Sequence, residues 1–205
     1  LLNEYGAMPY DSYNNRDINY KSLAKRMSTL SDASANMSLL EERAERVLDD
    51  HIGALPPHVF MLGAEYTPQE FAHSVCMRNE YMAMTSFTHH PFDEMFVLEI
   101  PDNYNNDPFY NVPIDVLMNR IEKSIRAGHP VCWEGDITEK GFSFKDGVAM
   151  LGKEQPCTQQ QRQTAFENRS TTDDHCMALI GLAHDKQGHR FYIAKNSWGT
   201  NNPYG

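Results

Sequence analysis

Two apolar segments near the C-terminal end of the chain are separated by a short polar turn, and they restrict the fold more than any other feature. Residues 176–183 and 190–194 have the composition of strands, and the turn at 185–188 ends in a glycine. Two such segments joined by a short turn are typical of an antiparallel β-hairpin. The sequence therefore predicts an antiparallel sheet in this part of the chain.

Two polar residues mark the outer ends of the predicted hairpin. His175 directly precedes the first strand, and Asn196 follows the second. Because a hairpin brings its outer ends together, we expect these side chains to be neighbours within hydrogen-bond distance, about 2.7–3.2 Å. A carboxamide that accepts from one imidazole nitrogen fixes the tautomer, so the other nitrogen can face a thiol. Trp198 is expected to shield this hydrogen bond from water.

Helix signals dominate the chain before the hairpin. A helix is predicted for residues 19–30, and a capping box formed by Ser38 and Glu41 predicts a second one that ends before Gly53. Two further helices are predicted. One begins after Thr67, which is the N-cap of a second capping box, and the other begins at Pro113. A strand is predicted for residues 129–133, so helices come first and strands last.

Segregated helices and strands are typical of the α+β class. We expect a helical part at residues 1–128 and a β-rich lobe at residues 129–205, the lobe that carries His175 and Asn196. The four cysteines form no C-x-x-C pair, which argues against a zinc ribbon or a disulfide-dense scaffold.

The charge pattern and hydropathy bear on two classes of partner, nucleic acids and membranes. The formal net charge is −10, from 18 basic and 28 acidic residues, and the basic residues form no run of five. Composition therefore gives no support for nucleic-acid binding. No window approaches the ~20 apolar residues that span a bilayer, so no membrane segment is predicted.

A metal site at His89 and His90, which precede Pro91, is the weakest interpretation of the sequence. Adjacent side chains of an extended segment point to opposite faces, and no carboxylate stands at ligand spacing. We therefore predict no metal and no cofactor. A Cys/His metal-binding domain remains a third alternative for the function.

The hairpin motifs resemble those of papain-like cysteine peptidases (family C1), in particular the bleomycin hydrolase and aminopeptidase C branch. The matching motifs are His175-Cys176-Met177-Ala178-Leu179-Ile180-Gly181 and Asn196-Ser197-Trp198-Gly199. The resemblance implies a papain-like fold, a helical lobe plus a β-barrel-like lobe, and cysteine exopeptidase activity on peptides, most specifically as an aminopeptidase. It assigns proton transfer to His175, orientation of the imidazole to Asn196 and cover of the pair to Trp198. It also implies a cytoplasmic protein and a homo-oligomer, often a ring-shaped hexamer.

The family's nucleophile has no match in this chain. In the family a Gln precedes a Cys-Trp pair at the start of a long helix, where the helix dipole lowers the thiol pKa. Cys132 precedes Trp133, but this pair lies in a predicted strand, so we interpret the match as a coincidence. The catalytic Cys is expected on a segment before Leu1, the fold is expected to be incomplete at both ends, and the chain alone is expected to be inactive.

The strand at residues 131–136 resembles the strand that lines the substrate cleft in papain-like folds. Trp133 and Glu134 are therefore candidate substrate-binding residues. Their alternative roles are a core aromatic residue for Trp133 and a solvated rim residue for Glu134. An alternative function is a catalytically inactive peptidase-like protein that binds peptides or has a structural role.

Overall fold

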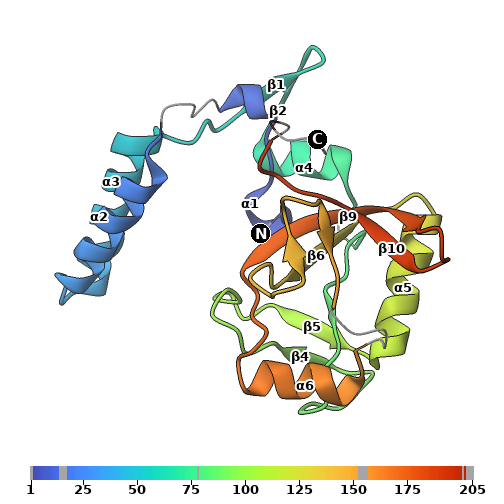
Figure 1. The fold of residues 1–205 in the computed structure, drawn as a ribbon. Helices are drawn as coiled ribbons and strands as arrows, with labels where there is room; N and C mark the ends of the chain where they lie inside the picture. The colour runs from blue at the N-terminus through green and yellow to red at the C-terminus, as the bar shows by residue number, and fades with distance from the viewer. Residues whose placement is uncertain (1, 14–17, 78, 152–156, 200, 202–205) are drawn as a thin grey trace. The chain divides into compact units, whose positions relative to one another are not determined.

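The chain forms two compact units, which we describe separately. The computed structural model describes residues 2–13, 18–77, 79–151, 157–199 and 201 (Figure 1). The units are Leu1–Tyr81 and Met82–Gly205. The predicted lobe boundary between residues 128 and 129 lies inside the second unit, and the lobe division stays a prediction.

The first unit consists mainly of helices. Its elements are α1 (Leu2–Tyr5), the 3-10 helix η1 (Tyr10–Ser12), α2 (Tyr20–Asp32), α3 (Met37–Ile52), the antiparallel pair β1 (Val59–Met61) and β2 (Ala64–Tyr66), and α4 (Pro68–Val75). The helices predicted near residues 19–30 and 38–52 and after Thr67 are thus confirmed as α2, α3 and α4. The short β1–β2 hairpin was not predicted.

Side-chain caps start these helices, although one differs from the prediction. The side chain of Asn36 accepts hydrogen bonds from the backbone N–H groups of Ser38 and Leu39, so Asn36 caps α3 and the predicted role of Ser38 as its cap is wrong. Thr67 and Glu70 form the predicted reciprocal capping box of α4. An Asn at the N-cap satisfies the same orphan N–H groups as a Ser would.

Within its described residues, the second unit contains two three-stranded sheets, one two-stranded sheet and two helices. β3 (Met84–Thr85), β5 (Pro108–Asn111) and β4 (Met95–Val97) form one sheet, in which β3 and β5 are parallel. β10 (Arg190–Lys195), β9 (His175–His184) and β6 (Val131–Gly135) form the other, which is antiparallel throughout. The remaining elements are α5 (Ile114–Arg126), the hairpin β7 (Phe142–Ser143) and β8 (Val148–Ala149), and α6 (Gln159–Glu167).

The predicted hairpin, the strand predicted at residues 129–133 and the helix predicted at Pro113 are confirmed as β9–β10, β6 and α5. Figure 1 shows α5 beside the β10-β9-β6 sheet, and α5 contacts both β6 and β9. Met177 and Leu179 of β9 are buried, so this central strand supplies much of the local core. No helix in the described part of the chain is long and apolar enough to cross a lipid bilayer.

Candidate active site

A β-bulge brings Asn196 to the face of the sheet that carries His175. Along most of the hairpin, residues of β10 and β9 pair in one register, but the pairing shifts by one residue between Ile193 and Ala194. Lys195 then pairs with Ala178, which sets Asn196 opposite Met177 rather than opposite Ala178. Since a shift of one residue exchanges the two faces of a strand, the bulge turns Asn196 toward the face of His175.

The predicted hydrogen bond between these residues is present. Oδ1 of Asn196 lies 2.9 Å from Nε2 of His175. The same oxygen accepts a hydrogen bond of 2.8 Å from the backbone N–H of Ser197. This second bond identifies the atom facing the imidazole as the carboxamide oxygen, because an NH₂ group could not accept from a backbone N–H. Nε2 of His175 therefore donates, and in the neutral ring Nδ1 carries the lone pair.

Trp198 packs against the imidazole and is itself supported by a second aromatic ring. Its ring centroid lies 4.8 Å from that of His175 and 4.9 Å from that of Phe144. The indole nevertheless remains 61% exposed. Trp198 thus covers one side of His175 while its outer face stays open to solvent, and Phe144 is a neighbour that the sequence motifs did not indicate.

The two predicted substrate-binding residues lie on opposite faces of β6. Gly135 pairs with His175 and Trp133 pairs with Met177, so Trp133 shares the face of His175. Glu134 pairs with Cys176 on the other face. Burial and the neighbouring charges of Asp173 and Asp102 raise the pKa of the Glu134 carboxyl. The structure therefore brings Trp133 toward the site and leaves Glu134 behind the sheet, while the binding role of each stays a prediction.

None of the described cysteines of this unit is hydrogen-bonded to His175. Cys132 and Cys176 lie on the opposite face of the sheet, with their sulfur atoms 3.1 Å apart, and Cys157 contacts the carbonyl of Thr158. The contact with Cys132, together with burial and the charge of Glu134, raises the pKa of Cys176 to about 11. A thiol with this pKa remains protonated at neutral pH and is a poor nucleophile.

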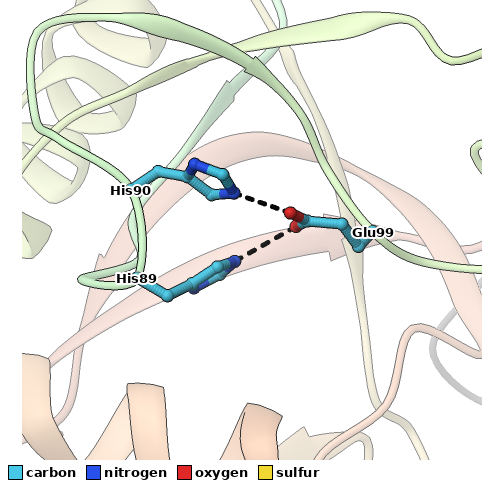
Figure 2. A group of neighbouring side chains, drawn as sticks. All are labelled: His89, His90 and Glu99. Carbon is cyan, nitrogen blue, oxygen red and sulfur yellow. Dashed lines mark hydrogen bonds and ion pairs between the residues drawn. The ribbon is translucent and has the colours of Figure 1, made fainter.

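A second cluster of functional groups lies at His89 and His90. We expected these two side chains to point to opposite faces of an extended segment, and that expectation is wrong. Figure 2 shows both imidazoles directed at the carboxylate of Glu99. Nε2 of His89 lies 3.1 Å from Oε2 of Glu99, and Nε2 of His90 lies 2.6 Å from Oε1. Residues 88–90 form a bend rather than an extended segment, so the alternation rule does not apply to them. Burial raises the pKa of Glu99, but the hydrogen bonds from His90 and His89 outweigh it and lower the pKa to about 2.

Comparison with known proteins identifies the family. The profile of the Peptidase C1-like family matches residues 58–203, which include both hairpin motifs. The chain belongs to the peptidase C1-like family. A search of curated proteins found no match.

A solved structure supports the same fold. PepW from Lactobacillus rhamnosis HN001 (DR20), determined as the selenomethionine derivative, superposes with a TM-score of 0.53 at 17% sequence identity. The match covers 87% of this chain and 47% of that of PepW, so the chain spans about half the length of this structural relative. At this identity the likeness concerns the fold alone, which is the predicted α+β papain-like fold.

Proposed function

We propose that this chain carries the His–Asn part of a cysteine-peptidase site and that the natural protein hydrolyses peptide bonds. The observation that carries the proposal is the double hydrogen bond accepted by Oδ1 of Asn196, from Ser197 N–H at 2.8 Å and from His175 Nε2 at 2.9 Å. It holds the imidazole in the tautomer whose Nδ1 is free to accept a proton. That is the state a base needs to activate a thiol.

The proposed mechanism assigns each side chain one task. Nδ1 of His175 takes the proton of the thiol, and the thiolate attacks the carbonyl carbon of the scissile bond. His175 then returns the proton to the departing amine, and an acyl-enzyme remains, which water hydrolyses with His175 again as base. Asn196 accepts from Nε2–H throughout and stabilises the imidazolium form, while Trp198 keeps water from one side of the ring.

We propose that the nucleophile of the site lies on another segment of the natural protein. Cys132 and Cys176 lie behind the sheet, and the raised pKa of Cys176 disfavours its thiolate. In the resembled peptidases a Cys at the start of a helix has the opposite environment, because the helix dipole and the imidazolium favour the thiolate. Without that segment the 205-residue chain is expected to be inactive.

The finer specificity follows the resemblance to the aminopeptidase C and bleomycin hydrolase branch. We propose exopeptidase action on the amino-terminal residue of peptides, with Trp133 as a cleft residue on the face of His175. Glu134 is retained as a candidate for substrate contacts outside that face. The same resemblance suggests a cytoplasmic homo-oligomer, with a ring of six subunits as the specific expectation.

Hydrolysis by the natural protein and by three variants tests the proposal. We expect His175→Ala to lower kcat/KM on an unblocked aminoacyl amide by at least about 1,000-fold and Asn196→Ala by about 10–100-fold. His189→Ala is the matched control, because His189 pairs with Asp185 on the hairpin turn and should not affect the rate.

The labelled thiol and the preferred substrate distinguish the alternatives. Iodoacetamide should modify one fast-reacting Cys outside residues 1–205, and an N-acetylated substrate should be cleaved more slowly than the unblocked one. Rapid labelling of Cys132 or Cys176, or equal loss of rate in the His175 and Asn196 variants with folding intact, would contradict the proposed roles. Absence of both hydrolysis and fast labelling would favour the catalytically inactive alternative.

A further inference from the structure

We propose that His89, His90 and Glu99 form a binding site for a divalent transition-metal ion of the zinc class. This inference does not depend on the proposed peptidase activity. The three ligand atoms lie within 4.8 Å of one another, and both Nε2 atoms point at one carboxylate (Figure 2). Ligands at 2.0–2.1 Å from a tetrahedral ion are about 3.3 Å apart. The imidazole–carboxylate separations of 3.1 and 2.6 Å therefore need to open by less than about 1 Å, and a separation at the upper limit of 4.8 Å needs to close by about 1.5 Å.

The backbone that carries the two histidines is fixed independently of their side chains. Asn111 is fully buried, and its carboxamide accepts from Phe87 N–H at 2.9 Å. It donates to the carbonyl oxygens of Phe87, His90 and Pro91 at 2.8, 3.0 and 3.0 Å. This one side chain therefore determines the bend that directs both imidazoles to the same side. A ligand set on a backbone held in this way is preorganised for an ion.

Aromatic stacking fixes the direction of each ring. His90 stacks on Phe96 with ring centroids 4.2 Å apart and an interplanar angle of 23°. His89 stacks on Phe166 at 5.4 Å and 14°. Rings held on one face cannot turn freely about their last side-chain bond, so the convergence of the Nε2 atoms is a property of the packed fold.

A purely structural role explains this arrangement less well. The side chains of His89, His90 and Glu99 are 27%, 34% and 55% exposed, and ion pairs with such exposure contribute at most about 1 kcal/mol to stability. The loop is already held by Asn111, so it does not need two imidazoles on one carboxylate. The same exposure leaves access for an ion and for a water molecule in its fourth position.

The ligand types select the class of ion. Two imidazole nitrogens and one carboxylate suit Zn²⁺ and its neighbours Co²⁺, Ni²⁺ and Cu²⁺. Mg²⁺ and Ca²⁺ prefer sites made of oxygen ligands alone. The cluster should therefore discriminate against the two abundant alkaline-earth ions.

Gln163 modulates the affinity of the site through His89. Gln163 is 2% exposed; its Oε1 accepts from Thr88 N–H at 2.6 Å, and its Nε2 donates to Glu167 at 2.9 Å. The same Nε2 lies 3.0 Å from Nδ1 of His89. An ion on Nε2 of His89 requires a proton on Nδ1, and that proton would face the amide donor. Ion binding must shift Gln163 or the ring, so we expect an exchangeable ion.

The substitution Gln163→Glu removes this conflict. A carboxylate at this position can accept from Thr88 N–H with one oxygen and from the Nδ1–H of His89 with the other. Outer partners of metal-ligating histidines change affinity by about 10–100-fold, so Gln163→Glu should tighten binding by at least about 10-fold. Glu167 is exposed and can turn away from the new charge.

Metal titration of the purified, chelator-treated protein tests the site. Calorimetry with Zn²⁺ should show one equivalent bound with a dissociation constant below about 10 µM. His90→Ala and Glu99→Gln should weaken binding at least about 10-fold. His189→Ala is the matched control, because His189 also contacts a carboxylate, Asp185, at 2.6 Å but belongs to no group of three converging metal-ligand side chains among the described residues. It should leave the titration unchanged.

Cobalt spectroscopy distinguishes this site from the two neighbouring thiols. Co²⁺ bound to His89, His90 and Glu99 should give visible d–d bands without the intense near-ultraviolet band of thiolate ligands. That band would place the ion on Cys132 and Cys176 and overturn the proposal. Absence of binding, or binding unaffected by His90→Ala and Glu99→Gln in chains with unchanged circular dichroism, would overturn it as well.

The Gln163→Glu variant keeps the test decisive if a ligand variant does not fold. It retains all three ligands, and its affinity must rise if Nδ1 of His89 gains an acceptor. Unchanged or weaker binding in a folded Gln163→Glu chain would contradict the assigned coordination through Nε2 of His89.

Discussion

The substitution Asn111→Ala tests the role of the buried carboxamide that holds the bend at residues 87–91. Asn111 is 0% exposed and makes four hydrogen bonds to the bend at residues 87–91. Alanine removes all four at once and leaves their partners in place. We expect the second unit to lose stability and the bend to lose its fixed geometry.

The magnitude follows from the burial of the partners. The N–H and carbonyl of Phe87 are bonded in a buried environment, and an unsatisfied buried group costs about 1–3 kcal/mol. The carbonyls of His90 and Pro91 are only partly buried and can be hydrated. The expected loss is therefore about 2–6 kcal/mol, a large share of the 5–15 kcal/mol that stabilise a typical domain.

Asn111→Asp separates hydrogen bonding from shape. Asp has nearly the same shape and still accepts from Phe87 N–H, but it presents a carboxylate oxygen to three carbonyl oxygens. We expect it to destabilise at least as much as alanine. Asn103→Ala is the matched control, since Asn103 makes three comparable hydrogen bonds in a more exposed turn where water can replace them. Its loss should stay below about 1 kcal/mol.

Urea unfolding followed by tryptophan fluorescence measures these differences. Trp133 and Trp198 are the two tryptophans of the sequence, and both belong to the second unit, so the signal reports on that unit. A loss below about 1 kcal/mol for Asn111→Ala, or wild-type stability for Asn111→Asp, would refute the argument that this buried carboxamide determines the bend.

Two further predictions concern the strand end next to His175. Burial raises the pKa of Asp136, but hydrogen bonds from Thr138 and Thr172 outweigh it and lower the pKa. A carboxyl group whose pKa is lowered by folding stabilises the folded state at pH values above its unfolded pKa of about 3.9. At pH 7 the wild-type chain should therefore be about 1–2 kcal/mol more stable in urea unfolding than Asp136→Asn, and this difference should shrink as the pH falls below about 4. A difference that does not change with pH would contradict this. Gly135→Ala should displace Trp133, because a Cβ at this position would lie 2.3 Å from the indole ring. We expect the variant to lose about 1–3 kcal/mol of unfolding free energy and to show a shifted tryptophan fluorescence maximum. An unchanged spectrum would argue against this packing.

Local signals in the sequence were sufficient for the long elements. Each long element has a local signal: a capping box at Thr67, a proline at Pro113, or an apolar strand segment bounded by polar residues. A regular spacing of apolar residues follows these signals, and all of the elements appear in the structure. The sheet of β3, β4 and β5 was missed because strands of two to four residues are too short to show alternation. The polar helix α6 was missed for lack of an apolar face, although Thr158 and Gln161 form a capping box that could have indicated it.

The sequence by itself determined the family, the β9–β10 hairpin and the neighbours His175 and Asn196, because these depend on motifs and on residues close along the chain. Only the tertiary structure decided which faces meet. The bulge that turns Asn196 toward His175 depends on cross-strand pairing. The convergence of His89 and His90 on Glu99 depends on a buried carboxamide about twenty residues further along the chain. Hydrogen bonds to distant residues override local alternation, and their partners cannot be identified before the chain is folded.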